Sequence, residues 1–181
     1  AVIADFNIIR DAPYRYVAAG AGDLVSNISA AEDWKRANAA GKEEYHALIA
    51  GFALNAADAV IYHANEIREK TYHGIEVLFW SLLSSSFAMN INRSSRPASG
   101  SEHNISHRLD ELGSTALHGE QVALASIVTT YLQDGDWKYI HDVLRRFGIP
   151  TTAHELGIGE EMMIEALATA VLSPIPASTT I

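Results

Sequence analysis

Three histidines in the middle of this sequence have the spacing of a metal-binding site. His103 and His107 are four residues apart, so a helix would place both imidazoles on one face. His118 begins the next predicted helix, and Gly119 beside it lets another backbone or a ligand approach closely. We therefore expect imidazoles from two neighbouring helix ends to converge on one divalent cation.

Asp23 is the candidate carboxylate for the same site. The sequence contains no cysteine, so a metal ion would have to be held by His, Asp or Glu. Gly20 and Gly22 precede Asp23 and predict a break that would expose Asp23 near a helix N-terminus. Nitrogen and carboxylate ligands suit a borderline cation such as zinc, and a catalytic zinc site keeps one position open. Capping of the helix by Asp23 is the alternative interpretation.

The other five histidines carry no comparable signal. A lone histidine of a helical protein is more often a surface or core residue than a metal ligand. Glu43 and His46 have the Glu-x-x-His spacing of di-iron bundles, but such a site needs two copies and the sequence has one. We interpret all five as structural residues: His46, His63, His73, His141 and His154.

The composition predicts one globular domain. A chain of 181 residues can bury a sizeable core, and 48% apolar with 19% charged residues excludes a disordered protein. The net charge is −9 and the basic residues are scattered, so the basic patch that nucleic-acid binding needs is missing. Apolar stretches fall short of the ~20 residues of a membrane span. The cytoplasm is the expected compartment.

The elements that must position these residues are predicted to be helices. Apolar residues recur at spacings of three or four, with almost no strand signal apart from an apolar N-terminal run at residues 1–4. The fold class is therefore all-α, a multi-helix domain with one short N-terminal strand. The helix at 74–90 is apolar on every side and is expected at the centre, and 92–100 reads as a polar loop. The other helices are predicted at about 24–39, 43–69, 102–112, 118–133, 137–147 and 160–172.

Several stretches resemble the glycerol-1-phosphate dehydrogenase family, which is related to glycerol dehydrogenases, iron-dependent alcohol dehydrogenases and dehydroquinate synthases. The resemblance extends over essentially the whole chain, and the loop before His103 separates this family from its relatives, which keep a metal triad but not that loop. The stretches are Gly20-Ala-Gly-Asp-Leu-Val-Ser-Asn27, Asp33-Trp34, Ser95-Arg-Pro-Ala-Ser-Gly-Ser-Glu-His103, Leu117-His-Gly-Glu-Gln-Val122, Asp136-Trp137 and Glu155-Leu-Gly157.

The resemblance implies a fold in two halves, an N-terminal nucleotide-binding α/β domain and a C-terminal helical domain. Residues 1–181 look like the second half, a single helical metal-binding catalytic domain that begins in the last strand of the first. The glycine-rich fingerprint of a dinucleotide site is absent, since Gly20 and Gly22 lack its strand-turn-helix context. NAD(P)H is thus expected to bind mainly to the absent half, which would be a partner of this chain. A homo-oligomer is a further expectation.

The resemblance also assigns roles to the candidate residues. Asp23, His103 and His118 match the metal ligands, which corrects the spacing argument, because His107 matches a residue that contacts the substrate instead. Zinc is the expected ion, and the same ligands also suit nickel or iron(II). Asp23 and His107 are expected to contact the substrate, and His107 is the candidate catalytic proton donor, with an orienting contact as the alternative.

Two further residues are candidates for supporting roles. Arg96 lies in the loop before a predicted helix N-terminus, a favourable place for the phosphate group of a substrate. Glu120 follows His118 closely and is a candidate to hold a ligand imidazole in the required tautomer.

The implied activity is the interconversion of dihydroxyacetone phosphate and sn-glycerol 1-phosphate with NADH or NADPH, which would supply the backbone of glycerophospholipids. The substrate would be a small phosphorylated polyol or ketone. One alternative is a glycerol or other polyol dehydrogenase with the same metal triad. Another is a non-catalytic metal-binding module. Dehydroquinate synthase chemistry is disfavoured, because the loop before His103 does not resemble that branch.

Overall fold

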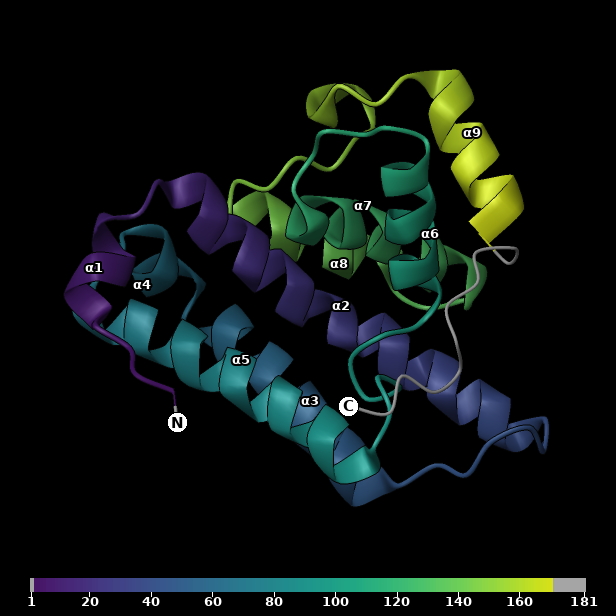
Figure 1. Cartoon of the computed structure of the whole chain (residues 1–181), viewed down its shortest axis with the longest axis horizontal. Coiled ribbons are helices and arrows are strands. Elements are labelled where there is room, and N and C mark those ends of the chain that lie inside the picture. The colour runs from purple at the N-terminus through teal and green to yellow at the C-terminus, as the bar shows by residue number, and fades with distance from the viewer. Residues whose placement is uncertain (1, 171–181) are drawn as a thin grey trace.

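The computed structural model describes residues 2–170, which form helices and connecting loops (Figure 1). Within this range the all-α prediction is confirmed, and the helices at 102–112, 118–133 and 137–147 lie where the apolar periodicity places them. The elements are α1 (Phe6–Asp11), α2 (Tyr14–Ala39), α3 (Ala47–Tyr62), α4 (Ala64–Arg68), α5 (Tyr72–Asn92), α6 (Ser101–Glu111), α7 (His118–Leu132), α8 (Trp137–Arg146), the 3-10 helix η1 (His154–Leu156) and α9 (Glu160–Thr169).

The predicted N-terminal strand is absent from the described residues 2–4. Val2 and Ile3 are exposed, and residues 2–170 contain no strand with which they could pair. A strand is stabilised by hydrogen bonds to a neighbouring strand, so the apolar run alone does not form one. Residue 1 lies outside the described part of the chain, as does the predicted end of the last helix at 172.

Helix α2 runs through the centre of the fold and packs against α3, α5, α6 and α7. The break predicted at Gly20 and Gly22 is wrong: both glycines lie inside one continuous helix, and Asp23 lies near its middle. A glycine costs about 1 kcal/mol relative to alanine in a helix interior. Tertiary contacts outweigh that cost here, because α2 is rich in alanine, glycine and serine and neighbouring helices approach it closely.

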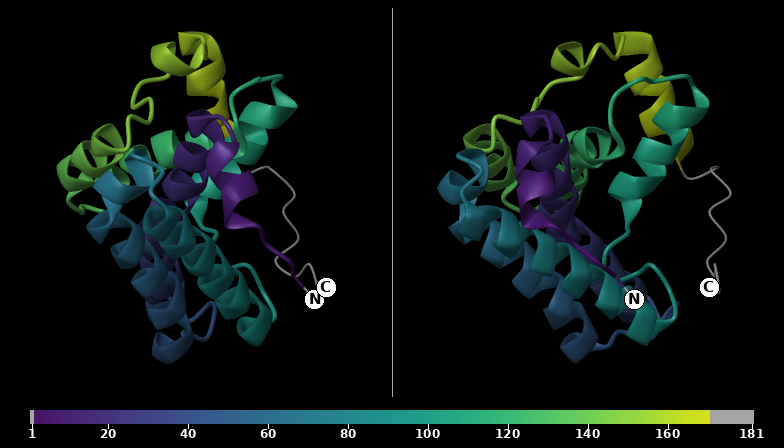
Figure 2. Two further views of the ribbon diagram at one scale, coloured as in Figure 1. Left: turned by 90° about the vertical axis from the view of Figure 1, so that its left-hand side faces the viewer. Right: turned by 60° about the vertical axis from the view of Figure 1, so that its left-hand side comes forward.

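Helix α5 lies at the periphery, so the central position predicted from its apolar composition is wrong. It packs along α3, and the two helices run side by side in Figure 2. By length and composition alone α5 could cross a membrane, contrary to the sequence-based expectation, although a single such helix is weak evidence. Large side chains on its outer face are exposed: Tyr72, Trp80, Phe87 and Ile91.

Among the described residues 2–170, two apolar clusters form the core and α7 contributes to both. The larger cluster gathers side chains from α2, α3, α4, α5, α7 and α8, including Leu24 and Ala123. The smaller cluster joins α6, α7 and α9 through Ile105, Leu124 and Ala166. Because neighbouring residues of α7 face the two clusters, this helix holds α6 in a fixed position beside α2. That arrangement places the candidate site between α2, α6 and α7.

One predicted helix is divided in the structure. The segment predicted as a single helix at 43–69 begins later, at Ala47, and is interrupted at His63, which ends α3 and precedes α4. The predicted loop at 92–100 is confirmed between α5 and α6. Arg93 adopts a left-handed backbone conformation there, with φ of 54°.

Candidate metal centre

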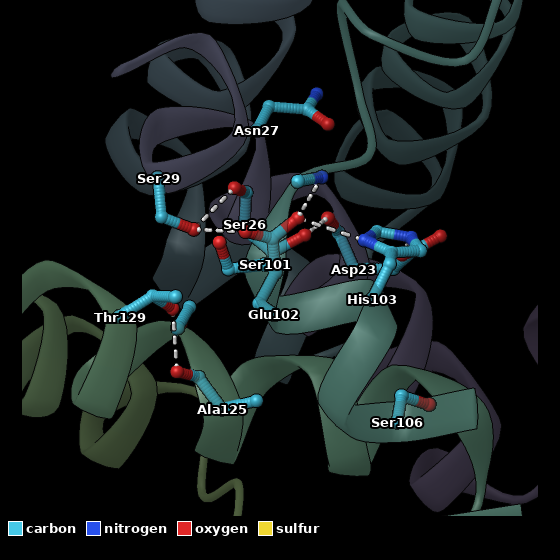
Figure 3. A network of polar contacts seen from close by, with 12 residues as sticks. Asp23, Ser26, Asn27, Ser29, Ser101, Glu102, His103, Ser106, Ala125 and Thr129 are labelled. Carbon is cyan, nitrogen blue, oxygen red and sulfur yellow. Dashed lines mark hydrogen bonds and ion pairs between the residues drawn. The ribbon is translucent and has the colours of Figure 1, made fainter. Parts of the chain in front are cut away.

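The structure brings Asp23, His103 and His118 together from α2, α6 and α7. Asp23 Oδ1 lies 3.5 Å from His103 Nε2 and 4.0 Å from His118 Nε2. The two imidazole rings lie 5.1 Å apart between centroids. One ligand atom from each of the three side chains lies within 4.8 Å of the others, a separation that one metal ion can bridge. Figure 3 shows Asp23 beside His103.

A contact between two glycines places Asp23 next to His118. A Cβ atom on Gly22 would lie 2.9 Å from the carbonyl oxygen of Gly119, and a Cβ on Gly119 would lie 2.0 Å from the carbonyl oxygen of Ala19. No larger residue fits at this crossing of α2 and α7 without a backbone shift. The prediction that Gly119 permits a close approach is thus confirmed. Its partner is the backbone of α2.

The start of α6 is fixed against α2 by Asp33. The Asp33 carboxylate accepts hydrogen bonds from the Ser101 backbone N–H at 2.7 Å and from the Ser101 hydroxyl at 2.6 Å. Its other oxygen accepts from the Gln133 side chain at 2.7 Å, which links α2 to the end of α7. A carboxylate at a helix N-terminus also interacts favourably with the positive end of the helix dipole. The N-terminus of α6 is therefore already occupied by an anionic side chain.

Glu102 orients the candidate ligand His103. The side chain of Glu102 is fully buried and accepts hydrogen bonds from the Ser29 hydroxyl at 2.8 Å and the Gly100 backbone N–H at 2.6 Å. Its Oε1 also lies 2.9 Å from His103 Nδ1, and Figure 3 draws this contact between the two labelled side chains. The Glu102 carboxylate accepts a hydrogen bond from His103 Nδ1–H, which leaves Nε2 directed at Asp23. The adjacent position of Glu102 in the sequence gave no sign of this role.

The charges around His103 change its titration. Burial lowers the pKa of His103, but hydrogen bonds to Asp23 and Glu102 outweigh this effect and raise the pKa to about 9. Burial lowers the pKa of His118, although Asp23 opposes the shift. The pKa values of the two imidazoles are thus shifted in opposite directions, because the carboxylates act mainly on His103.

A serine fixes the tautomer of His118. Ser106 Oγ lies 3.1 Å from His118 Nδ1 and donates its single proton to Gln121 Oε1 at 2.7 Å. The Gln121 amide nitrogen Nε2 donates to the Asp110 carboxylate at 2.9 Å, so the amide oxygen Oε1 is the atom that faces Ser106. Ser106 can therefore only accept from His118 Nδ1–H. This leaves Nε2 of His118 unprotonated and facing Asp23.

Glu120 does not orient His118, contrary to the prediction. Its carboxylate forms a pair of hydrogen bonds with Arg15, at 2.7 Å each, and accepts from the Leu117 backbone N–H at 2.9 Å. Glu120 therefore caps α7 and joins it to the first turn of α2. The pKa of Glu120 is lowered: burial opposes the shift, but the hydrogen bonds from Arg15 and Leu117 outweigh it.

His107 lies beside the site and outside the ligand set. Its ring centroid is 5.9 Å from that of His118, and the residue is exposed. The i,i+4 argument placed His107 on the same face as His103, and the structure agrees with that placement. Because His107 is open to solvent, it is able to exchange protons with water.

The structure places Arg96 in contact with Glu43. The guanidinium of Arg96 makes two hydrogen bonds to the Glu43 carboxylate, one of them 2.6 Å long from Nε. This ion pair joins the 92–100 loop to the segment before α3. To bind a substrate phosphate, as predicted, the Arg96 side chain would thus have to break its hydrogen bonds to Glu43 and form new ones to the phosphate.

The donor set fits a divalent ion. Two imidazole nitrogens and one carboxylate oxygen are ligands that zinc, nickel and iron(II) accept, and three protein ligands leave a position for another group. Both imidazoles have a partner on their second nitrogen, as ligand histidines usually do. Asp23, His103 and His118 are the residues that could hold such an ion.

Comparison with known proteins identifies relatives of the chain. No protein-family profile matches it. It is 49% identical to a glycerol-1-phosphate dehydrogenase, NAD(P)+, of Pyrococcus horikoshii, and 44% and 45% identical to proteins of that name from Hyperthermus butylicus and Thermococcus kodakarensis. Each alignment covers 94% of this chain and 49% of the relative. The chain therefore spans about half the length of these relatives, and the resemblance seen in the motifs is confirmed.

Proposed function

Because the chain is homologous to glycerol-1-phosphate dehydrogenases over about half their length, we propose that it is the metal-binding half of such an enzyme. The proposed reaction interconverts dihydroxyacetone phosphate and sn-glycerol 1-phosphate with NADH or NADPH, and supplies the backbone of glycerophospholipids. Residues 1–181 act as a single helical catalytic domain in the cytoplasm. The nucleotide-binding half, outside this sequence, holds most of the NAD(P)H.

One observation carries the proposal: Asp23, His103 and His118 meet with their ligand atoms within 4.8 Å of one another. These residues lie on three helices and are separated by up to 95 positions in the sequence, so chance proximity is a poor explanation. The hydrogen bonds that Glu102 and Ser106 make to the two imidazoles support the same interpretation, because they leave both Nε2 atoms for a cation.

The residues of the site have distinct tasks in this proposal. When bound, a divalent cation supplies positive charge that stabilises the negative charge developing on the carbonyl oxygen as hydride arrives. Asp23, His103 and His118 hold that cation, with zinc as the expected ion and nickel or iron(II) as alternatives. Asp23 also borders the substrate.

His107 supplies the proton in the proposed reaction. A ring nitrogen of His107 donates a proton to the substrate oxygen and recovers one from solvent, to which the residue is exposed. The alternative is that His107 only orients the substrate by a hydrogen bond. Arg96 is proposed to bind the substrate phosphate after leaving Glu43.

One observation favours a second candidate, a dehydrogenase for glycerol or another unphosphorylated polyol. Arg96 is paired with Glu43 and the N-terminus of α6 is occupied by Asp33, so two predicted phosphate partners already have anionic neighbours. Rates with glycerol and with glycerol 1-phosphate, measured after the nucleotide-binding half is supplied, distinguish the two substrates.

Metal analysis of the purified chain tests the proposal. The unmodified chain is expected to retain zinc through dialysis, and Asp23→Ala is expected to lose one equivalent, because one of three ligands is removed. Asp58→Ala, which removes an exposed carboxylate of α3, serves as the matched control and should retain the metal. Equal metal content in Asp23→Ala and Asp58→Ala would contradict the proposed site. If zinc is bound but no activity appears with the nucleotide-binding half present, the chain is a non-catalytic metal-binding module.

A further inference from the structure

A second cluster of metal-ligating side chains lies where α4 meets α5. Ligand atoms from His63, Glu66 and His73 lie within 4.8 Å of one another. The proposed reaction uses none of these residues, and from the sequence alone both histidines are interpreted as structural residues. One signal was nevertheless present, the i,i+3 spacing of His63 and Glu66, but nothing in the sequence placed His73 beside them.

The turn between α4 and α5 is held by several hydrogen bonds. The Thr71 backbone N–H donates to the Glu66 carbonyl at 3.0 Å, and the Lys70 N–H donates to the Ile67 carbonyl at 3.0 Å. Thr71 also caps α5, since its hydroxyl accepts from the Gly74 N–H at 3.0 Å. Because these bonds fix both helix ends, side chains on either side of the turn have a defined relative position.

Gly74 brings the first turn of α5 directly against α4. A Cβ atom at this position would lie 2.4 Å from both the carbonyl carbon and the carbonyl oxygen of Glu66. Only glycine permits this approach. His73 is therefore held next to the backbone of Glu66 by its neighbour in the sequence, much as Asp23 is held next to His118 by the glycines of the first site.

The side chains of the cluster converge in a partly open position. His63 Nδ1 contacts Glu66 Oε2, and the rings of His63 and His73 lie 5.0 Å apart between centroids at an angle of 87°. The three side chains are 24%, 44% and 59% exposed in chain order, so an ion and a water molecule can reach them. Glu76 Oε2 lies 3.7 Å from His73 Nδ1 and adds a second carboxylate beside that ring.

The basic residues of this turn donate hydrogen bonds to backbone carbonyls outside the cluster. Arg68 donates to the carbonyl of Arg146 at 3.0 Å, and Lys70 donates to the carbonyl of Ala12 at 3.0 Å. Their contacts hold α4 to the rest of the fold and do not neutralise Glu66. The cluster therefore combines two imidazoles with carboxylates whose charge favours a cation.

We propose that His63, Glu66 and His73 bind one divalent transition-metal ion, with zinc as the expected species. Two imidazoles and one carboxylate are a common set for borderline cations and less suited to magnesium or calcium, which prefer oxygen ligands. The bound ion clamps α4 to the start of α5. An ion that binds the folded state but not the unfolded state raises the stability of the fold.

Zinc titration of the chain and its variants tests this site. With both sites present the unmodified chain binds two equivalents, and His73→Gln binds one. Asp23→Ala also binds one, and the double variant binds none. His141→Gln, which removes a partly exposed histidine of α8 outside both clusters, is the matched control and keeps both equivalents. If the first site fails, the unmodified chain binds a single equivalent that His73→Gln removes, so the two proposals fail separately.

Thermal unfolding provides a second measurement of the same site. Added zinc is expected to raise the Tm of Asp23→Ala and to leave the Tm of Asp23→Ala/His73→Gln unchanged. Because His73 is exposed, His73→Gln is expected to fold as the unmodified chain does, and circular dichroism checks this. Retention of the full zinc complement by both His63→Gln and His73→Gln would overturn the proposal.

Discussion

Gly22 of α2 and Gly119 of α7 pack against each other so closely that a Cβ on Gly22 would lie 2.9 Å from the Gly119 carbonyl oxygen. Asp23 follows the first glycine and His118 precedes the second. The crossing point of the two helices therefore determines the distance between two candidate metal ligands. Stability and metal binding should be coupled at this contact.

Replacement of Gly22 by alanine tests this coupling. The new methyl group would meet the Gly119 carbonyl, the Ala123 side chain and Ile149, all within 3.1 Å. We expect a loss of about 1–3 kcal/mol in the free energy of unfolding and weaker zinc binding, because α2 and α7 must separate. Urea denaturation and zinc titration measure the two effects.

Gly51→Ala is the matched control for that prediction. Gly51 lies in α3, and a Cβ there has no heavy atom within 4 Å among the described residues outside its own helix turn. The substitution should stabilise the chain by roughly 0.5–1 kcal/mol through helix propensity alone. If Gly22→Ala also stabilises the chain and binds zinc normally, the glycine contact does not position the site.

Glu102→Gln should weaken metal binding without disrupting the fold. Glutamine keeps the shape of the buried side chain but removes the negative charge beside His103 Nδ1. Loss of such a partner typically weakens metal affinity about 10–100-fold. Glu160→Gln removes an exposed carboxylate of α9 and should leave the zinc affinity unchanged. Equal affinities for the two variants would exclude the orienting role of Glu102.

Ser106→Ala should change the tautomer of His118. In the unmodified chain the Ser106 hydroxyl oxygen accepts a hydrogen bond from His118 Nδ1–H, so ring nitrogen NMR shifts should report an Nδ1–H tautomer. Without the hydroxyl, a mixture of tautomers is expected and zinc binds more weakly. Ser126→Ala removes a buried serine of α7 that donates to the Ala123 carbonyl, and serves as control. Persistence of the Nδ1–H form in Ser106→Ala would show that another group fixes the ring.

Arg96→Ala tests the phosphate role within the proposed function. In the enzyme completed by its nucleotide-binding half, this substitution should raise KM for glycerol 1-phosphate much more than KM for glycerol, because only the former carries a phosphate. Glu43→Gln keeps the guanidinium and removes its partner, so it should not raise KM for the phosphorylated substrate. An equal effect of Arg96→Ala on both substrates would mean that Arg96 only fixes the loop.

Glu155 should make stability depend on pH in the acid range. Hydrogen bonds from the Thr151 backbone, Arg145 and Thr152 lower the pKa of Glu155 from 4.5 to about 2. A depressed carboxyl pKa stabilises the fold above pH 4.5, and this contribution is lost as the pH falls from 4.5 to 2. Glu155→Gln should therefore be less stable at pH 7 than the unmodified chain, and the difference should disappear near pH 2. Urea denaturation at several pH values measures this difference in the free energy of unfolding. A difference that does not change with pH would contradict the assignment.

The sequence alone predicted much of the secondary structure of this chain. Apolar periodicity is a local property, so the helices that carry His103 and His118 were predicted within a few residues of their observed ends. The polar loop at 92–100 follows from its turn-forming residues in the same way. The similarity to glycerol-1-phosphate dehydrogenases was also recognisable in the motifs, because sequence similarity does not depend on the fold being known.

Tertiary packing decided what local patterns could not. The glycines before Asp23 read as a helix break, yet they lie inside α2, because close contact with α7 stabilises a helix that propensity disfavours. Helix α5 reads as central but lies at the surface, since an apolar composition does not specify which neighbours a helix has.

The sequence thus determines which residues are available as metal ligands. The fold determines which of these residues lie close enough together to share one ion. Spacing along one helix grouped His103 with His107, whereas the crossing of α2 and α7 places Asp23 beside His118. The sequence also did not reveal that Glu102 and Ser106 are the partners of the imidazoles, or that His73 lies beside His63 and Glu66. The physical reason is that contacts between helices depend on residues far apart in the chain, and these distances are fixed only when the core is packed.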